Sequence, residues 1–299
     1  MEEKNFLFIG VPAFNEEKSI ERMLNSVFRQ DLWRKTPSDR KQILVCANGC
    51  TDRTVRIVKA LQASHPEIKL IELKEANKPS AWNAIKRNAP KEAKILFFAD
   101  ADVILGPRTL SRMWRDFQLK KEVQVISSSA IPIKESAKNS IVKAHNEPII
   151  KFAKENPPNQ ISGALYGIRR DAAERTRIPK YIISEDLFLS CVFEGKVFRD
   201  PKARVYFKLP QTVKEIINLR LRGGKAIGQL KALNLMSKKF SEQRVSRSIK
   251  SLKELNSNQK LLRVLFLGLS KGAELKSRMN PLKGHKWKQL PSTKIPKKI

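Results

Sequence analysis

Cysteine is scarce in this chain, and so is histidine. Cys46, Cys50 and Cys191 are the only cysteines, and the two that are close in sequence could pair only across a tight turn. We therefore expect reduced thiols in a cytosolic protein, not a disulfide framework. The three histidines are scattered and do not show the spacing of a metal site.

Long apolar runs are also missing. The longest, around residues 261–269, carries Arg263 and is far shorter than the roughly 20 residues of a membrane-spanning helix. The first residues, MEEKNFLFIGVPAF, have neither the basic region nor the cleavage site of a secretory signal. These features predict a cytoplasmic protein that does not cross a bilayer but could lie peripherally on the inner face of the membrane.

Acidic residues are few relative to basic ones. The chain has 60 Lys or Arg against 29 Asp or Glu, a formal net charge of +31. Residues 231–299 hold 18 Lys or Arg against 3 Asp or Glu, so about half of the excess lies in this C-terminal part. Such a charge favours polyanionic partners, namely nucleic acid, anionic lipid or phosphorylated substrates, and does not bear on the fold.

The first two hundred residues alternate between short β-rich runs and amphipathic helical patterns. This alternation predicts βαβ units and a mostly parallel sheet with helices on both faces. The expected strands are 6–11, 42–47, 68–73, 94–99 and 123–129, and the expected helices between them are 16–30, 52–64 and 107–118. Further on we expect a helix in 137–155 interrupted near Pro148, a strand entering a short helix in 160–172, a helix in 184–195 and a strand pair near 196–200 and 203–209.

Polar clusters follow three of these strands. They are 12-PAFNEE-17, 48-NGCTD-52 and 100-DAD-102. Because ligands of open α/β sheets gather at the carboxyl ends of the strands, the three clusters are expected to lie on one rim. This rim is where the sequence predicts a site.

Asp100 and Asp102 have two interpretations. Residues i and i+2 of an extended segment point to the same side, so the two carboxylates would project together. An acidic turn that caps the next helix explains an isolated Asp-x-Asp. A divalent cation such as Mg²⁺ or Mn²⁺ binds carboxylates, water and phosphates, and the polar clusters that flank Asp100 and Asp102 favour this second interpretation.

Two later segments carry the same kind of ambiguity. In 184-SEDLF-188, Glu185 and Asp186 stand at an expected helix start, either as acids on the helix dipole or with one as a general base. In 218-NLRLRGGK-225, Arg220 and Arg222 are either an ordinary basic helix face or a clamp for a diphosphate.

The whole series resembles a known family. PAFNE, NGCTDRT, NKPSAWN, DAD, SGALYGIRR, SED and RLRGG, in this order, are similar to the GT-A glycosyltransferases of family 2, and the likeness covers residues 6 to about 230. It implies a Rossmann-like GT-A fold and a hexosyltransferase that moves a sugar, with inversion, from a nucleotide-diphosphate sugar to an acceptor hydroxyl or phosphate. It also implies a Mg²⁺ or Mn²⁺ cofactor, a donor expected to be a UDP-sugar, and an acceptor that could be lipid-linked.

The resemblance assigns roles by position. Asp186 would be the catalytic base with Glu185 beside it. Asp102 and Asp100 would form the metal site, and Asp100 would also approach the ribose. The acceptor side would be formed by Gly163, Ala164 and Arg169. The nucleotide and diphosphate would be bound by Pro12, Ala13, Asn15, Glu16, Asn48, Asp52, Lys78, Asp100, Arg220 and Arg222.

The chain departs from the family pattern at two places. Ala47-Asn48 replaces the usual acidic pair and offers amide hydrogen bonds without charge, and Gly223 replaces the Trp of processive members. The second departure favours a single transfer over polymer synthesis. A nucleic-acid-binding protein and a nucleotidyltransferase remain as alternatives; the first lacks a recognisable RNA or zinc motif and the second a Gly-rich phosphate loop.

The division of the chain is expected near residue 230. Residues 1–230 would form the catalytic domain, and residues 231–299 a basic helical extension whose Pro- and Lys-rich end, 281–299, is poorly ordered. Within the extension, 258–279 has Leu, Val and Phe on one face and Lys and Arg on the other. That pattern fits an interfacial helix on anionic lipid, and equally a helix packed on the catalytic domain.

Overall fold

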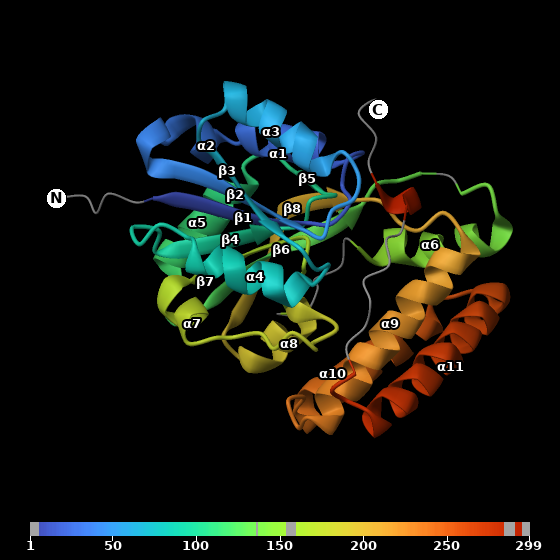
Figure 1. Cartoon of the computed structure of the whole chain (residues 1–299). Coiled ribbons are helices and arrows are strands. Elements are labelled where there is room, and N and C mark those ends of the chain that lie inside the picture. The colour runs from blue at the N-terminus through green and yellow to red at the C-terminus, as the bar shows by residue number, and fades with distance from the viewer. Residues whose placement is uncertain (1–5, 136, 154–159, 284–290, 295–299) are drawn as a thin grey trace.

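The computed structural model describes residues 6–135, 137–153, 160–283 and 291–294. Strands and helices alternate through the first two thirds, and helices alone follow (Figure 1). The strands are β1 (Leu7–Ala13), β2 (Lys41–Asn48), β3 (Ile68–Leu73), β4 (Ile95–Ala99), β5 (Ile104–Leu105), β6 (Val125–Pro132), β7 (Leu165–Arg169) and β8 (Val197–Phe207). The helices are α1 (Ile20–Phe28), α2 (Asp31–Lys35), α3 (Thr54–Ser64), α4 (Lys78–Arg87), α5 (Thr109–Leu119), α6 (Ser140–Phe152), α7 (Arg170–Glu174), α8 (Glu185–Val192), α9 (Val213–Ala232), α10 (Lys238–Lys253) and α11 (Ser257–Met279).

The eight strands form one mixed sheet in the order β3-β2-β1-β4-β7-β6-β8-β5. β1, β2, β3 and β4 are mutually parallel, β6 is parallel to β8, and β7 runs antiparallel to both β4 and β6. The expected α/β sheet, mostly parallel with helices on both faces, is confirmed. The carboxyl ends of β1, β2 and β4 therefore meet at one rim, as the sequence pattern predicts.

Side chains of successive residues in the central strands point to opposite faces of the sheet. On one face Ile9 of β1 and Phe97 of β4 pack under α1, α3 and α5. On the other face Phe8 and Phe98 pack under α4, α7 and α8. Because both faces are buried, these strands read as continuous apolar runs rather than as alternating ones.

Most expected elements are found near their expected places, with three differences. The expected interruption near Pro148 is not found: α6 continues through Pro148, although proline has no N–H for a backbone hydrogen bond. Packing of Val142 against Ile216 and Phe266 holds the first half of this helix. The expected strand pair is the single strand β8, which pairs with β6 across a register shift. α2, α4 and β5 were not among the expected elements.

The C-terminal helices form a group beside the sheet, drawn in orange to red in Figure 1. α9 and α11 approach very closely at two glycines of α9: a Cβ on Gly224 would lie 2.1 Å from the carbonyl oxygen of Ser270, and one on Gly228 would lie 2.1 Å from that of Glu274. Among the described residues, no helix has the length and apolar content needed to cross a membrane. Of the segment 281–299, residues 284–290 and 295–299 lie outside the described part, and Pro291–Thr293 form a single 3-10 turn.

The glycine contact between α9 and α11 gives a prediction with an adjacent control. Gly224→Ala places a methyl group against backbone that cannot rotate away, so we expect the free energy of unfolding to fall by about 2–3 kcal/mol. Gly223→Ala meets nothing within 4 Å and removes a flexible residue from a helix, so it is expected to stabilise by roughly 0.5–1 kcal/mol. Thermal and denaturant unfolding of the two variants measures both; equal stabilities would contradict the close packing.

Candidate functional site

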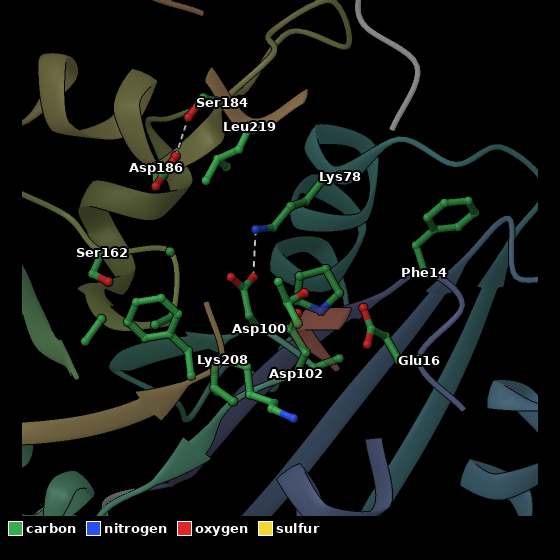
Figure 2. Close-up of a pocket in the computed structure, with 18 of the residues that line it drawn as sticks. Phe14, Glu16, Lys78, Asp100, Asp102, Ser162, Ser184, Asp186, Lys208 and Leu219 are labelled. Carbon is green, nitrogen blue, oxygen red and sulfur yellow. Dashed lines mark hydrogen bonds and ion pairs between the residues drawn. The ribbon is translucent and has the colours of Figure 1, made fainter. Parts of the chain in front are cut away.

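The rim at the carboxyl ends of β1, β2 and β4 opens into a cavity of about 330 Å³. β1 contributes Pro12, β2 contributes Asn48, and the turn after β4 contributes Asp100 and Asp102. The opposite wall comes from the start of α8, from α9 and from the residues that follow β8 (Figure 2). The cavity therefore lies where the chain order of polar clusters placed a site.

Lys78 neutralises two of the carboxylates in this cavity. Its ammonium group lies 2.7 Å from Asp100 Oδ1 and forms a second ion pair with Glu185. Figure 2 shows the Lys78 side chain reaching toward Asp100. Burial raises the pKa of both carboxyl groups and the Lys78 charge lowers it, while burial lowers the pKa of Lys78 and its acidic neighbours raise it above its usual value.

Lys294 neutralises the next two carboxylates from a distant part of the chain. Its ammonium group lies 2.9 Å from Asp102 Oδ2 and also forms an ion pair with Glu16. Burial and then the charge of Asp102 raise the pKa of Glu16 to about 7, although Lys294 and a hydrogen bond from Ser19 oppose this. Glu16 and Asp102 thus repel each other and share one cation.

Asp186 is held at the start of α8 with one oxygen turned to the cavity. The Ser184 hydroxyl and the Leu187 N–H, the latter at 2.9 Å, both donate to Asp186 Oδ1. A methyl group built on Gly163 would lie 3.4 Å from Asp186 Oδ2 and 3.5 Å from Asp100 Oδ2. The space in front of Gly163 therefore faces two carboxylate oxygens from opposite walls.

Asn48 has a buried acceptor that the protein does not use. Its Nδ2 donates to the Ala13 carbonyl at 2.7 Å, and its side chain is almost fully buried. No hydrogen-bond partner for Oδ1 is found in the part of the chain that the structure describes. Because a buried unpaired acceptor is costly and Asn48 lines the cavity, this oxygen suits an N–H donor of a ligand.

Most of the residues singled out from the sequence come together here. Those that line the cavity are Pro12, Glu16, Asn48, Lys78, Asp100, Asp102, Gly163, Ala164, Glu185, Asp186 and Arg222. They come from segments more than two hundred residues apart, which supports the interpretation of the ordered clusters as one site.

Five others do not line it. Ala13 is buried in β1. Asn15 and Asp52 join the loops after β1 and β2: Asn15 Oδ1 accepts the Thr51 N–H at 2.7 Å, and Asp52 Oδ2 accepts the Glu17 N–H at 3.0 Å. Arg169 donates to the carbonyls of Val123 and Phe117, each at 2.8 Å, and fixes the connection between α5 and β6.

Arg220 is the fifth residue outside the cavity. Its guanidinium Nη2 lies 2.8 Å from Nε2 of His145 on α6, whereas Arg222 lines the cavity. The two arginines are two residues apart on a helix, so they point in different directions.

Several lining residues were not predicted. Lys208 follows β8 directly, and its place just past a strand end could have indicated from the sequence that it lines the site. Ser184 stands at the N-cap position of α8, and its hydroxyl donates to Asp186 while making no hydrogen bond to the helix backbone. Phe14, Ser162 and Leu219 lie within the polar segments quoted above but were not assigned a role, and no local pattern in the sequence indicates Thr293 or Lys294.

The carboxylates of Glu16 and Asp102 fit a divalent cation. They already hold one positive charge between them, the Lys294 ammonium group, and oxygen ligands are those that Mg²⁺ and Mn²⁺ prefer. Within the described ranges no group of three or more His, Cys, Asp or Glu is placed to hold a metal by itself. Remaining ligands would therefore have to come from water and substrate phosphates, as is usual for Mg²⁺.

Comparisons of the sequence identify a family and one curated relative. The family model described as "Glycosyl transferase family 2" matches residues 8–177, more than half of the chain. A dolichyl N-acetyl-alpha-D-glucosaminyl phosphate 3-beta-D-2,3-diacetamido-2,3-dideoxy-beta-D-glucuronosyltransferase of Methanococcus voltae is 34% identical over 99 residues. That match spans 32% of this chain and 30% of the length of the relative.

Solved structures share the fold at low sequence identity. The mannosyltransferase PcManGT from Pyrobaculum calidifontis, solved with GDP-Man and Mn²⁺, superposes with a TM-score of 0.62 at 18% identity, covering 89% of this chain and 75% of that one. TarS 1–349 of S. aureus, solved with UDP-GlcNAc, gives a TM-score of 0.54 at 16% identity, covering 93% and 89%. The GT-A architecture expected from the motif series is thereby confirmed.

Proposed function

The chain belongs to glycosyltransferase family 2 and uses a nucleotide sugar. We propose that it transfers one sugar, with inversion, to an acceptor hydroxyl that is bound in this cavity, and that Asp186 is the general base. One observation carries the proposal: Asp186 Oδ2 and Asp100 Oδ2 face the same space in front of Gly163. An acceptor entering beside Asp186 would meet a donor held beside Asp100. Residues 1–230 supply every lining residue of this cavity except Thr293 and Lys294, in keeping with a catalytic domain of that extent.

The proposed reaction is a single displacement. The acceptor oxygen bonds to the anomeric carbon of the sugar while the bond from that carbon to the diphosphate oxygen breaks. Asp186 Oδ2 takes the hydroxyl proton, and Oδ1 remains fixed by Ser184 and Leu187. Glu185 has a different role, because its ion pair with buried Lys78 holds the two walls of the cavity together and keeps its carboxylate from the acceptor.

Basic side chains on the wall opposite the β-strand ends would neutralise the negative charge of the leaving diphosphate. Arg222 and Lys208 line the cavity and suit phosphate oxygens. Glu16 and Asp102 would hold Mg²⁺ or Mn²⁺, which would supply further positive charge at the diphosphate. PcManGT was solved with Mn²⁺, and we propose the same kind of cofactor here.

Asn48 supports a specific donor base. Its buried Oδ1 needs an N–H donor, which the N3–H of uracil provides. TarS was solved with a UDP-sugar and shares the fold. We therefore propose a UDP-sugar donor.

The acceptor is proposed to be linked to a polyprenyl phosphate. The name of the Methanococcus voltae relative describes a dolichyl-linked sugar phosphate as its acceptor. α11 also presents a row of exposed apolar side chains: Leu261, Val264, Leu265 and Leu269. With a net charge of +31, this face suits the anionic cytoplasmic surface of a membrane, where such an acceptor would be available.

Transfer assays of Asp186→Asn test the catalytic role. Asn cannot take the proton, so we expect kcat to fall by about 10²- to 10⁴-fold while the affinity for the nucleotide sugar is unchanged. Asp171→Asn, which alters an exposed carboxylate paired with Arg175, is the control and should transfer normally. An Asp186→Asn enzyme with undiminished kcat would remove Asp186 from the reaction.

Vesicle binding tests the proposed membrane face. We expect the protein to pellet with anionic vesicles and to be released by added salt. Leu261→Ser combined with Leu265→Ser should lower the partition coefficient at least about tenfold, because both leucines would lose contact with the acyl region. Leu119→Ser on α5 removes a leucine that is more exposed than either and is the control; identical binding by all three proteins would place the membrane contact elsewhere.

A further inference from the structure

A second cavity, of about 360 Å³, lies beside the first under α6 and α11. Ala130 of β6 and Phe207 of β8 line both cavities and form the wall between them. Most of the second lining is apolar: Pro132, Ala144, Pro148, Ile149, Ala153, Leu255, Leu262 and Phe266. Its size is within the range of sites for small organic ligands.

Two arginines bring positive charge to this apolar space. Arg263 of α11 lines the cavity, and Arg220 of α9 bonds His145, which lines it too. The Nε atoms of both arginines are buried and have no hydrogen-bond partner in the described ranges. Burial and then the Arg263 charge lower the pKa of Arg220 to about 10, so the two cations are close enough to repel.

His145 does not relieve this repulsion. Burial lowers its pKa to about 4, and the charges of Arg220 and Arg263 act in the same direction, so the ring is neutral near pH 7. It stacks edge-on against Phe266 with ring centroids 5.4 Å apart. No ion pair joins a carboxylate to either arginine in the part of the chain that the structure describes. Two partly buried guanidinium groups without an acid call for an anion from outside the protein.

We propose that this second cavity binds the phosphate group and the adjoining hydrocarbon of a polyprenyl-phosphate-linked acceptor. The phosphate lies between Arg220 and Arg263, the hydrocarbon covers the apolar lining, and the acceptor sugar passes Ala130 and Phe207 into the first cavity. This inference rests on the proposed function for the destination of the sugar, but not for the binding of the lipid phosphate.

The arrangement of α11 agrees with this assignment. Leu262, Arg263 and Phe266 face the cavity, whereas Leu261, Val264 and Leu265 are exposed on the other side of the same helix. One helix therefore separates the cavity from the surface proposed to lie on the membrane. A lipid chain bound in the cavity would thus lie one helix away from that surface.

Farnesyl phosphate binding to the full chain, measured by titration calorimetry, tests the site. Arg263→Met keeps the apolar packing and removes a charge that has no partner, so the fold should be retained. We expect its Kd to rise roughly tenfold to a hundredfold, the effect of one charged hydrogen bond. Ala144→Trp fills the cavity and should weaken binding at least tenfold.

The controls separate this site from general charge and from the reaction. Lys260→Met removes an exposed cation from the same helix and should bind as the wild type does. Farnesol and inorganic phosphate, each lacking one half of the ligand, should both bind more weakly. Equal farnesyl phosphate affinity in wild type, Arg263→Met and Ala144→Trp would overturn the inference even if sugar transfer is normal. Tight, Arg263-dependent binding without any transfer would instead leave the site standing and refute the proposed function.

A different observation concerns the C-terminal residues that reach the donor site. Ser292 donates its backbone N–H to Glu215 Oε1 at 2.9 Å, and its hydroxyl accepts the Gln211 N–H at 2.8 Å. These contacts fix the 3-10 turn Pro291–Thr293 at the start of α9. Lys294 follows directly and lies between Glu16 and Asp102, nearly buried.

We infer that Lys294 closes the donor site and competes with the divalent cation for the same two carboxylates. Metal binding then requires the Lys294 ammonium group to leave Glu16 and Asp102, where it becomes available to the diphosphate. The C-terminal turn would thus connect loading of the metal to access of the donor.

Direct Mn²⁺ binding, followed by the spectrum of free Mn²⁺ in electron paramagnetic resonance, tests this competition without an activity assay. Lys294→Met leaves the two carboxylates without their cation, so we expect Mn²⁺ to bind at least about tenfold more tightly. Lys283→Met, which removes an exposed charge from the same part of the chain, should not change the affinity. Unchanged or weaker Mn²⁺ binding in Lys294→Met would overturn the inference.

Discussion

Repulsion among carboxylates at one rim of the sheet is the constraint on which the site depends. Five acids line a single cavity, and burial raises the pKa of three of them, with Glu16 at about 7. Two lysines from distant segments supply the opposing charge, Lys78 from the start of α4 and Lys294 from the C-terminal turn. The five acids are Glu16, Asp100, Asp102, Glu185 and Asp186.

The fold produces this concentration of charge because helices on both faces bury the central strands, and the acids follow at the carboxyl ends of those strands or at the starts of the helices. Asp100 follows directly from β4, which is buried along its whole length. α4 begins at Lys78 and α8 at Glu185, so the two helix starts deliver a cation and an anion to the same point. The buried ion pair of Lys78 with Glu185 joins the two walls of the cavity.

The sequence predicts which strand ends form the rim of the site, but it does not predict the C-terminal turn that covers part of that rim. The alternation of strand and helix patterns in the sequence places Pro12, Asn48 and Asp100 together, because the carboxyl ends of parallel strands lie at one edge of the sheet. Directions of side chains on helices and at strand ends are decided by packing, which explains why Arg220 of α9 and Arg169 at the end of β7 point elsewhere. The 3-10 turn that brings in Lys294 is fixed by the hydrogen bond from Ser292 to Glu215, 77 positions earlier in the chain, and no local sequence pattern indicates this contact.

The most direct test of the account is whether a nucleoside diphosphate and a divalent cation bind together at these carboxylates. Thermal unfolding would be measured for wild type and Asp102→Ala with a panel of nucleoside diphosphates, in Mn²⁺ and in EDTA. The account predicts that UDP stabilises the wild type in Mn²⁺, and that both EDTA and Asp102→Ala abolish the effect. Stabilisation that persists in EDTA or in Asp102→Ala, or none with any nucleotide, would contradict a metal and diphosphate site at this rim.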